Sequence, residues 1–141
     1  MTATTYGRRP RANRYLADSL STASPATLLV MLYDRLVLDL QRAEQAQRDG
    51  DRETAHVNLV HAQDIIRELL SSLEVEKWEG GSGLRALYTW LLQELSSANV
   101  AGDAERTAAC RTTTVEPLAE AWRQAALEHL SSTPATGHGV A

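Results

Sequence analysis

The chain has 141 residues, of which 43% are hydrophobic and 23% charged, and its net charge is −4 at pH 7. This balance fits one globular domain with a buried core, and the negative charge argues against a protein that wraps nucleic acid. No apolar run approaches the roughly 18 residues that cross a bilayer, and the N-terminus lacks the apolar core of a secretory signal. The lone Cys110 excludes an internal disulfide and suits a reducing compartment. We expect a cytoplasmic protein that neither binds nucleic acid nor inserts in a membrane.

The N-terminal stretch divides into a polar tail and a short amphipathic segment. Residues 1–12 are polar and basic, and we expect a disordered, solvated tail, although its arginines could also touch phosphate or an acidic partner. In residues 13–20, apolar side chains including Tyr15 and Leu16 share one side. This segment is too short to be a stable helix alone. It could dock on an apolar surface, and the nearest is the far face of the next helix.

The first long helix is predicted over residues 24–49, with Ser24 as the cap, Pro25 in the first turn and Gly50 just after the end. Its apolar residues cover more than one side. One face collects most of them, and Met31 and Leu38 point nearly the opposite way. The core face holds Leu29, Leu32, Tyr33, Leu36, Leu40 and Ala43, Leu28 lies between the two faces, and Val30 and Val37 flank the far edge.

The second and third helices carry cleaner apolar stripes. Asp51 is predicted to cap a helix that extends to about Leu73, and after the glycine-rich break at residues 80–83 a third helix is predicted with Ser82 as its cap. Their stripes step by three and four residues, as in a helical bundle. The second holds Ala55, Leu59, Ala62, Ile66, Leu69 and Leu73, the third holds Leu84, Leu87, Tyr88, Leu91, Leu95 and Ala98, and Trp90 and Leu92 fall off the third stripe.

The last helix is predicted to begin after Asp103 and to end near Leu130, with a flaw at Pro117. Proline removes one amide and crowds the carbonyl four residues back, so the helix either kinks or divides there. We favour the kink, because the apolar phase continues across Pro117. Its expected core residues are Ala108, Val115, Leu118, Trp122, Ala125 and Leu130.

Four long helices joined by short loops predict an all-α, antiparallel up-and-down four-helix bundle with a short N-terminal helical segment. No strand pattern is present, and the chain has no phenylalanine and little valine or isoleucine. We expect three parts: a disordered tail at residues 1–12, a helical bundle domain at residues 13–130 and a disordered tail at residues 131–141.

The sequence offers little for catalysis or metal binding. His56 and His61 diverge by about 140° on a helix, so they cannot share a metal, and Cys110 stands alone in its region. The glycine-rich break follows a helix rather than a strand, which argues against a phosphate cradle. His61 with Asp64 forms no triad without a nucleophile. We therefore expect no enzyme, no metal and no cofactor.

The surplus apolar surface of the first helix is the functional question. From the pattern alone, two explanations have equal weight: the N-terminal segment or a homodimer completes the core, or the surface binds a partner. A combined version, in which the segment covers a groove and yields it to a partner, is also sensible. The candidate partner-binding residues in the bundle are Leu28, Val30, Met31, Val37, Leu38, Trp90 and Leu92.

Several short stretches, in order, resemble the flagellar secretion chaperone family FliS. The likeness covers about residues 13–127. The stretches are Asn13-Arg14-Tyr15, Thr22-Ala23-Ser24-Pro25, Met31-Leu32-Tyr33-Asp34, Ala62-Gln63-Asp64-Ile65-Ile66, Glu79-Gly80-Gly81, Leu95-Ser96-Ser97-Ala98-Asn99 and Leu118-Ala119-Glu120-Ala121-Trp122.

The resemblance implies an export chaperone that binds the disordered C-terminal segment of flagellin, prevents early polymerisation and helps present the subunit at the flagellar export gate. It also implies that Tyr15 and Leu16 cover the empty client groove and take part in docking at the gate. It leaves open whether other flagellar regulators bind the same surface. One departure is Ala26-Thr27 after Ser24-Pro25, where the family often has acidic residues. The rival hypothesis is a structural homo-oligomer that pairs through the apolar stripe. A weak homodimer would be one form of it.

Overall fold

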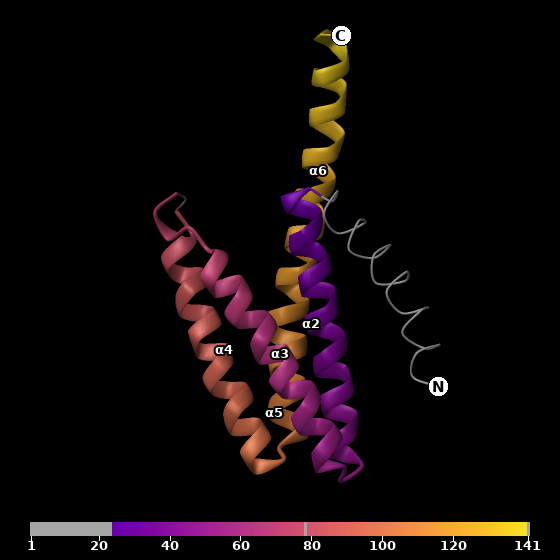
Figure 1. Cartoon of the computed structure of the whole chain (residues 1–141), viewed down its shortest axis with the longest axis vertical. Helices are drawn as coiled ribbons and strands as arrows, with labels where there is room; N and C mark the ends of the chain where they lie inside the picture. Colours follow the sequence, from indigo (N-terminus) through magenta and orange to yellow (C-terminus); the bar gives the residue numbers. More distant parts are fainter. Residues whose placement is uncertain (1–23, 78, 141) are drawn as a thin grey trace, which may run out of the picture. The chain divides into compact units, whose positions relative to one another are not determined.

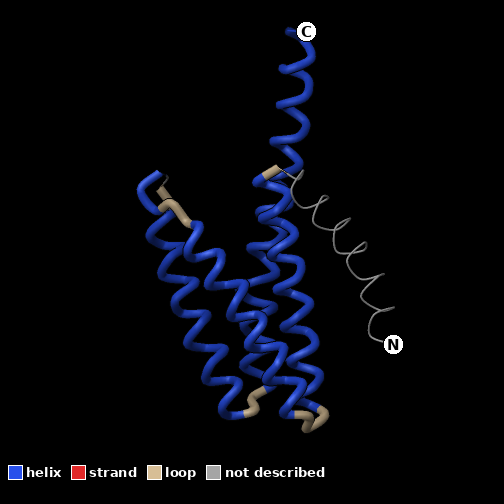
Figure 2. The backbone as a smooth tube through the Cα atoms, viewed as in Figure 1, coloured by secondary structure: helices blue, strands red, loops and turns tan. Residues whose placement is uncertain are grey.

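The computed structural model describes the backbone of residues 24–77 and 79–140 and the side chains of these ranges up to residue 128. The helices are α2 (Pro25–Arg48), α3 (Arg52–Ser72), α4 (Gly81–Ala101), α5 (Ala104–Ala109) and α6 (Glu116–Val140), with the short 3₁₀ helix η1 (Val75–Lys77) and the π-helix η2 (Cys110–Val115). The described residues contain no strand (Figures 1 and 2). The predicted all-α fold is confirmed, whereas the predicted N-terminal helical segment lies outside the described residues.

Side chains cap three of the helices as predicted. Ser24 Oγ accepts from the amide of Thr27 at 3.1 Å, Asp51 accepts from Thr54 at 3.1 Å, and Asp103 accepts from Arg106 at 3.1 Å. The two bonds from Thr54 hold the pKa of Asp51 below its usual value. Gly50 and Gly102 follow α2 and α4 with φ of 76° and 65°, the left-handed conformation that glycine adopts without strain.

The predicted cap at Ser82 is wrong. The helix begins earlier, at Gly81, with Gly80 in the cap position and no side-chain cap bond. Gly81 lies against the backbone of η1, where a Cβ would be 2.5 Å from the carbonyl oxygen of Val75. The start of α4 is thus set by a close backbone approach that only glycine permits.

The chain forms two compact units. Of the described residues, one unit holds the first turns of α2, up to Met31, and α6 from Trp122 onward. The other comprises Leu32–Ala121 and contains the rest of α2, all of α3, α4, α5 and η2, and the start of α6. Figure 1 shows α3 and α4 of this second unit side by side.

In the second unit, α2 is joined to each of its neighbours by polar contacts as well as by apolar packing. Asp39 of α2 bonds to His61 of α3, and Gln47 of α2 donates to the Ala98 carbonyl of α4 at 3.1 Å. Short loops join consecutive helices, so neighbours in sequence run antiparallel. Most of the predicted stripe residues form the core, which holds Tyr33, Leu36, Leu40, Ala43, Ala55, Leu59, Ala62, Ile66, Leu69, Leu84, Tyr88, Leu91, Leu95 and Ala98. The remaining stripe residues are only half-buried: Leu29, Leu32, Leu73 and Leu87.

The helix around Pro117 is irregular but not divided. Residues 104–140 are helical without a break, and the change takes the form of the π-helix η2 before the proline. There the amide of Glu116 donates to the Arg111 carbonyl, five residues back. The wider turn moves the carbonyl four residues before Pro117 away from the proline ring, which a regular helix would not do.

The π-helix also changes which residues of the last helix are buried. An extra residue in one turn shifts the phase of the helix, so Ala119 and Ala126 are buried, whereas the expected Ala125 is exposed. Leu118 and Trp122 are half-buried. The helix also runs to Val140 rather than ending near Leu130. The division into a bundle domain and two tails remains a prediction.

Candidate functional site

The candidate residues at the start of α2 are partly accessible. Leu28 and Val30 are half-buried, and Met31 is 38% exposed. None of the three is fully buried, and residues of a binding surface must be accessible in this way. Tyr15 and Leu16 lie outside the described residues.

Further along α2, Val37 and Leu38 are both half-buried and lie on different sides of the helix. Adjacent residues are about 100° apart around a helix axis. Leu38 follows Arg35 by three positions and precedes Arg42 by four, so it shares a side with these two exposed arginines. Asp34, also exposed, precedes Leu38 by four positions, so the surroundings of Leu38 are charged, with two bases and one acid, rather than purely apolar.

The two candidates on α4 lie on opposite flanks. The carbonyl of Leu92 accepts from Gln63 of α3 at 3.2 Å, beside an open depression of about 440 Å³. Trp90, which is 42% exposed, lies on the flank of Glu94, whose carboxylate pairs with Arg106 of α5 at 3.3 Å. A single extended segment would have to pass around α4 to touch both residues.

Sequence analysis missed four exposed apolar residues. They fall outside the predicted stripes, and that position was the available signal. They are Val57 and Val60 on α3, Val100 on α4 and Leu127 on α6.

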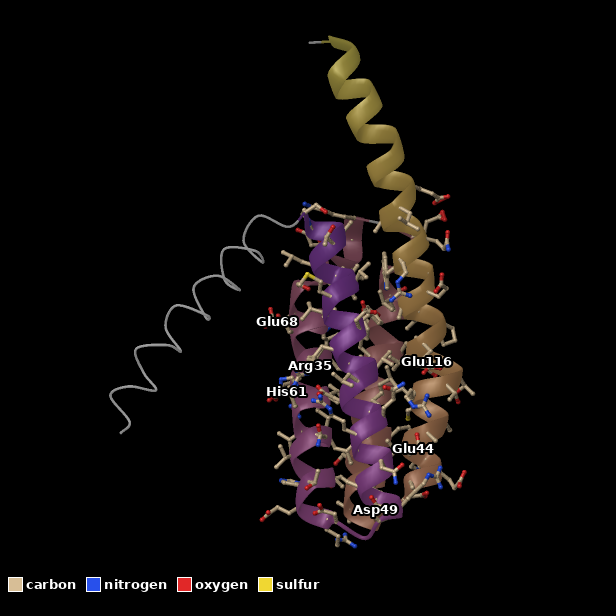
Figure 3. All side chains as sticks on the ribbon, turned by 90° about the vertical axis from the view of Figure 1, so that its right-hand side faces the viewer. Arg35, Glu44, Asp49, His61, Glu68 and Glu116 are labelled. Atoms are coloured by element: carbon tan, nitrogen blue, oxygen red, sulfur yellow. The ribbon has the colours of Figure 1, made fainter. Side chains whose placement is uncertain are left out.

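A buried carboxylate joins α2 to α3, and sequence analysis did not predict it. Asp39 is fully buried, Arg35 donates from Nε to its Oδ1 at 3.0 Å, and His61 Nδ1 makes a short contact with its Oδ2. Figure 3 shows Arg35 and His61 next to each other on this side of the protein. The only available signal was spacing, since Asp39 follows the buried Leu36 by three positions and precedes Ala43 by four.

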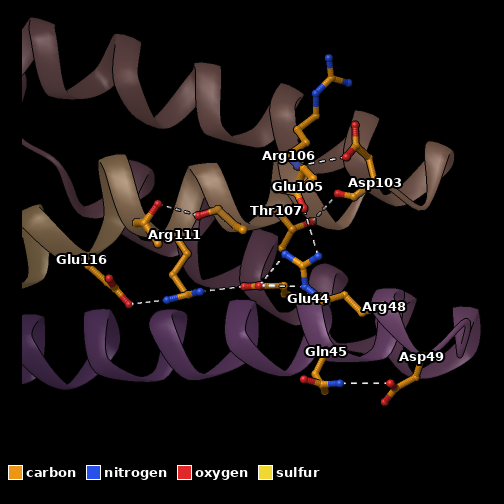
Figure 4. A network of polar contacts seen from close by, with 12 residues as sticks. Glu44, Gln45, Arg48, Asp49, Asp103, Glu105, Arg106, Thr107, Arg111 and Glu116 are labelled. Carbon is orange, nitrogen blue, oxygen red and sulfur yellow. Dashed lines mark hydrogen bonds and ion pairs between the residues drawn. The ribbon is translucent and has the colours of Figure 1, made fainter.

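A second polar cluster joins α2 to α5, η2 and α6 (Figure 4). Arg111 donates to Glu44 and to Glu116, at 2.7 Å each, and Arg48 bridges Glu44 at 2.9 Å and Glu105 at 3.1 Å. The Arg111 and Glu44 side chains are only 18% and 16% exposed. Glu44 is thus paired across helices.

Charge pairing decides the protonation of Glu44. Burial alone raises the pKa of this carboxyl, but hydrogen bonds and attraction from Arg111 and Arg48 outweigh that effect and hold the pKa below its usual value of 4.5. Glu44 is therefore charged at neutral pH.

The core contains polar groups without a reactive arrangement. The hydroxyls of Tyr33 and Tyr88 lie 2.6 Å apart, and burial raises the pKa of Tyr88. This confirms both tyrosines as core residues. Burial, with the nearby Glu94 charge, raises the pKa of Cys110 to about 11, so its thiol stays protonated.

The described residues hold no group of three or more His, Cys, Asp or Glu side chains placed to bind a metal. Within the same ranges, every helix is too short or too polar to cross a membrane.

Comparison with known proteins gives a consistent result. Residues 8–129 match the family model described as "Flagellar protein FliS". Three similar curated proteins are each named "Flagellar secretion chaperone FliS". The Bacillus subtilis (strain 168) protein is 32% identical over 79% of this chain and 82% of its own length. The Campylobacter jejuni protein is 33% identical over 79% of this chain and 88% of its own length. The Escherichia coli (strain K12) protein is 28% identical over 86% of this chain and 90% of its own length. This chain belongs to the FliS family of flagellar secretion chaperones.

Proposed function

We propose that this protein is a cytoplasmic export chaperone that binds the disordered C-terminal segment of flagellin. Binding prevents premature polymerisation and assists delivery to the flagellar type III export gate. Membership of the FliS family is the observation that carries the proposal. The protein acts by binding and needs neither catalysis nor a cofactor.

The partly exposed apolar side chains support this proposal. A segment that folds as it binds spends about 2–5 kcal/mol on ordering, which apolar burial must offset. Met31 and Trp90 remain 38% and 42% exposed, and burying a fully exposed side chain of this size contributes roughly 1.5–3 kcal/mol, so covering the exposed part of each supplies under half of that. The proposed client contacts are Leu28, Val30, Met31, Val37, Leu38, Trp90 and Leu92.

The N-terminal segment completes the proposal. Tyr15 and Leu16 cover the client surface in the empty protein and contribute to docking at the export gate. A cover of this kind lowers apparent client affinity by the fraction of time that it is in place.

The test is titration calorimetry of the full chain with the C-terminal segment of the flagellin from the same organism. A Met31→Asp, Leu38→Asp double variant should lose detectable binding while its helical circular dichroism stays the same. Val100→Asp, another charge at an exposed apolar position, is the matched control and should bind as the unmodified protein does. Retained binding in the double variant would contradict the assigned contacts.

Deletion of residues 1–20 separates a cover from a contact. Client affinity should rise or stay unchanged, and a large loss would make that segment part of the binding site. An obligate dimer in sedimentation at low micromolar concentration, with no uptake of the flagellin segment, would favour the homo-oligomer instead.

A further inference from the structure

The buried Asp39 holds an arginine in a fixed position at the protein surface. Its Oδ1 accepts only the Nε–H of Arg35, at 3.0 Å, and its Oδ2 is occupied by His61 of α3. The carboxylate is fully buried, whereas the Arg35 and His61 side chains are 51% and 47% exposed. The acid is therefore inside and the two bases reach solvent.

Arg35 keeps unused hydrogen-bonding capacity. A guanidinium has five N–H donors in a planar fork, and only the Nε–H is used here. Among residues 24–77 and 79–128, no side chain or carbonyl accepts from Nη1 or Nη2 of Arg35. This outer edge matches the two oxygens of a carboxylate.

Stability alone does not account for Asp39. A buried acid paired with bases rarely stabilises a fold more than an apolar residue of similar size would. The arrangement does restrict Arg35, because an exposed arginine loses rotamer freedom on binding unless it is already held. His61 contributes by fixing the other oxygen of the same carboxylate.

The surroundings of Arg35 favour an acidic, partly apolar occupant. Arg42 lies two turns away on the same side of α2, is exposed, and has no ion pair with any described residue. Leu38 lies between the two arginines on that side. Glu68 is exposed on the same side of the protein as Arg35 and His61 (Figure 3), and it forms no ion pair with Arg35.

We propose that Arg35, positioned by the buried Asp39 and His61, binds an acidic side chain of the client segment, next to the apolar contact at Leu38. This inference rests on the proposed function, since the occupant is the flagellin C-terminal segment. Arg35 touches the client, whereas Asp39 and His61 are positioning residues. Arg42 adds a second positive charge along the same strip.

The test measures the affinity of a fluorescently labelled flagellin C-terminal segment for the full-length protein by anisotropy, at several salt concentrations. Arg35→Gln should weaken binding about tenfold, as expected for the loss of a charge-assisted bidentate contact, and should flatten the salt dependence. Arg35→Lys, which keeps the charge but not the fork, should fall between. Arg85→Gln on α4, also an exposed arginine of a helix, is the control and should bind normally.

The positioning role of Asp39 is tested in the same assay. Asp39→Leu, which removes both acceptor oxygens, should lower client affinity several-fold and leave the circular dichroism unchanged, because Arg35 keeps its charge but is no longer held. Client variants with single acid-to-arginine changes identify the contact, since one of them should restore binding to Arg35→Glu.

Two outcomes overturn the inference and differ in what else they overturn. If the unmodified protein binds the segment and Arg35→Gln binds as well as Arg85→Gln does, Arg35 is not a client contact and the proposed function stands. If the unmodified protein does not bind the segment, the proposed function itself fails.

Discussion

Two clusters on α2 pair an acid with bases from other positions, and they differ in how many carboxylates each base serves. At Glu44, both Arg111 and Arg48 are shared between two carboxylates, and Arg111 is only 18% exposed. At Asp39, one buried carboxylate is shared by two half-exposed bases, and Arg35 keeps unused donors. The first cluster ties α2 to η2 and α6, whereas the second ties α2 to α3 and also leaves groups for a partner.

The difference shows that burial of the acid is not the feature that marks a binding site. The carboxyl groups of Glu44 and Asp39 are both largely or fully buried. What distinguishes them is that Arg111 and Arg48 each bridge two carboxylates, whereas Arg35 and His61 each pair with Asp39 alone. The Glu44 cluster, here called the closed cluster, contributes to stability. The Asp39 cluster, here called the open cluster, can also contribute to recognition.

The largest effect should come from opening the closed cluster. Glu44→Ala leaves Arg111 largely buried with only Glu116 as a partner, so we expect the free energy of unfolding to fall by about 2–3 kcal/mol. Urea denaturation measures this loss. Glu105→Ala, at the exposed end of the same cluster, should cost less than about 0.5 kcal/mol, and equal losses in both variants would contradict the distinction.

Acid should weaken the same cluster by a smaller amount. The pKa of Glu44 is lowered by folding, so its contribution is present above the unfolded value, near 4.5, and is lost as the pH falls through the folded value. Unfolding free energies measured between pH 6 and pH 3 should therefore fall less steeply in Glu44→Gln than in the unmodified protein. Parallel curves would show that Glu44 gains nothing from its partners.

Replacing the acid of the open cluster should cost little. In Asp39→Leu the two bases can turn to water, and we expect an unfolding free energy within about 1 kcal/mol of the original, with stabilisation as an acceptable result. Chemical denaturation with circular dichroism measures it. A loss above roughly 3 kcal/mol would make Asp39 a structural acid like Glu44.

The smallest effect on stability should come from Arg35→Gln. Because Arg35 is half-exposed, its pair with Asp39 is worth less than about 1 kcal/mol. Its thermal midpoint, recorded beside that of Arg85→Gln, should match the control closely. The client affinity of Arg35→Gln should nevertheless be lower than that of Arg85→Gln. This result would show that Arg35 contributes to binding rather than to stability.

The sequence by itself determined the helices and their buried sides. Serine and aspartate caps at Ser24, Asp51 and Asp103 and glycines at Gly50 and Gly102 are local signals, because each acts within one turn of the chain. Apolar spacing then fixed the stripes of α2, α3 and α4, since helical periodicity is also local. Together these features predicted the all-α bundle.

Only the tertiary structure decided how these helices meet. The role of Asp39 depends on the register that places His61 of α3 beside it. In the same way, the packing of the helices decides that Leu92 lies beside α3 and that the flank of Trp90 lies beside α5. Local patterns determine which residues turn inward, but a contact between distant segments requires their relative register, which no short stretch of sequence contains.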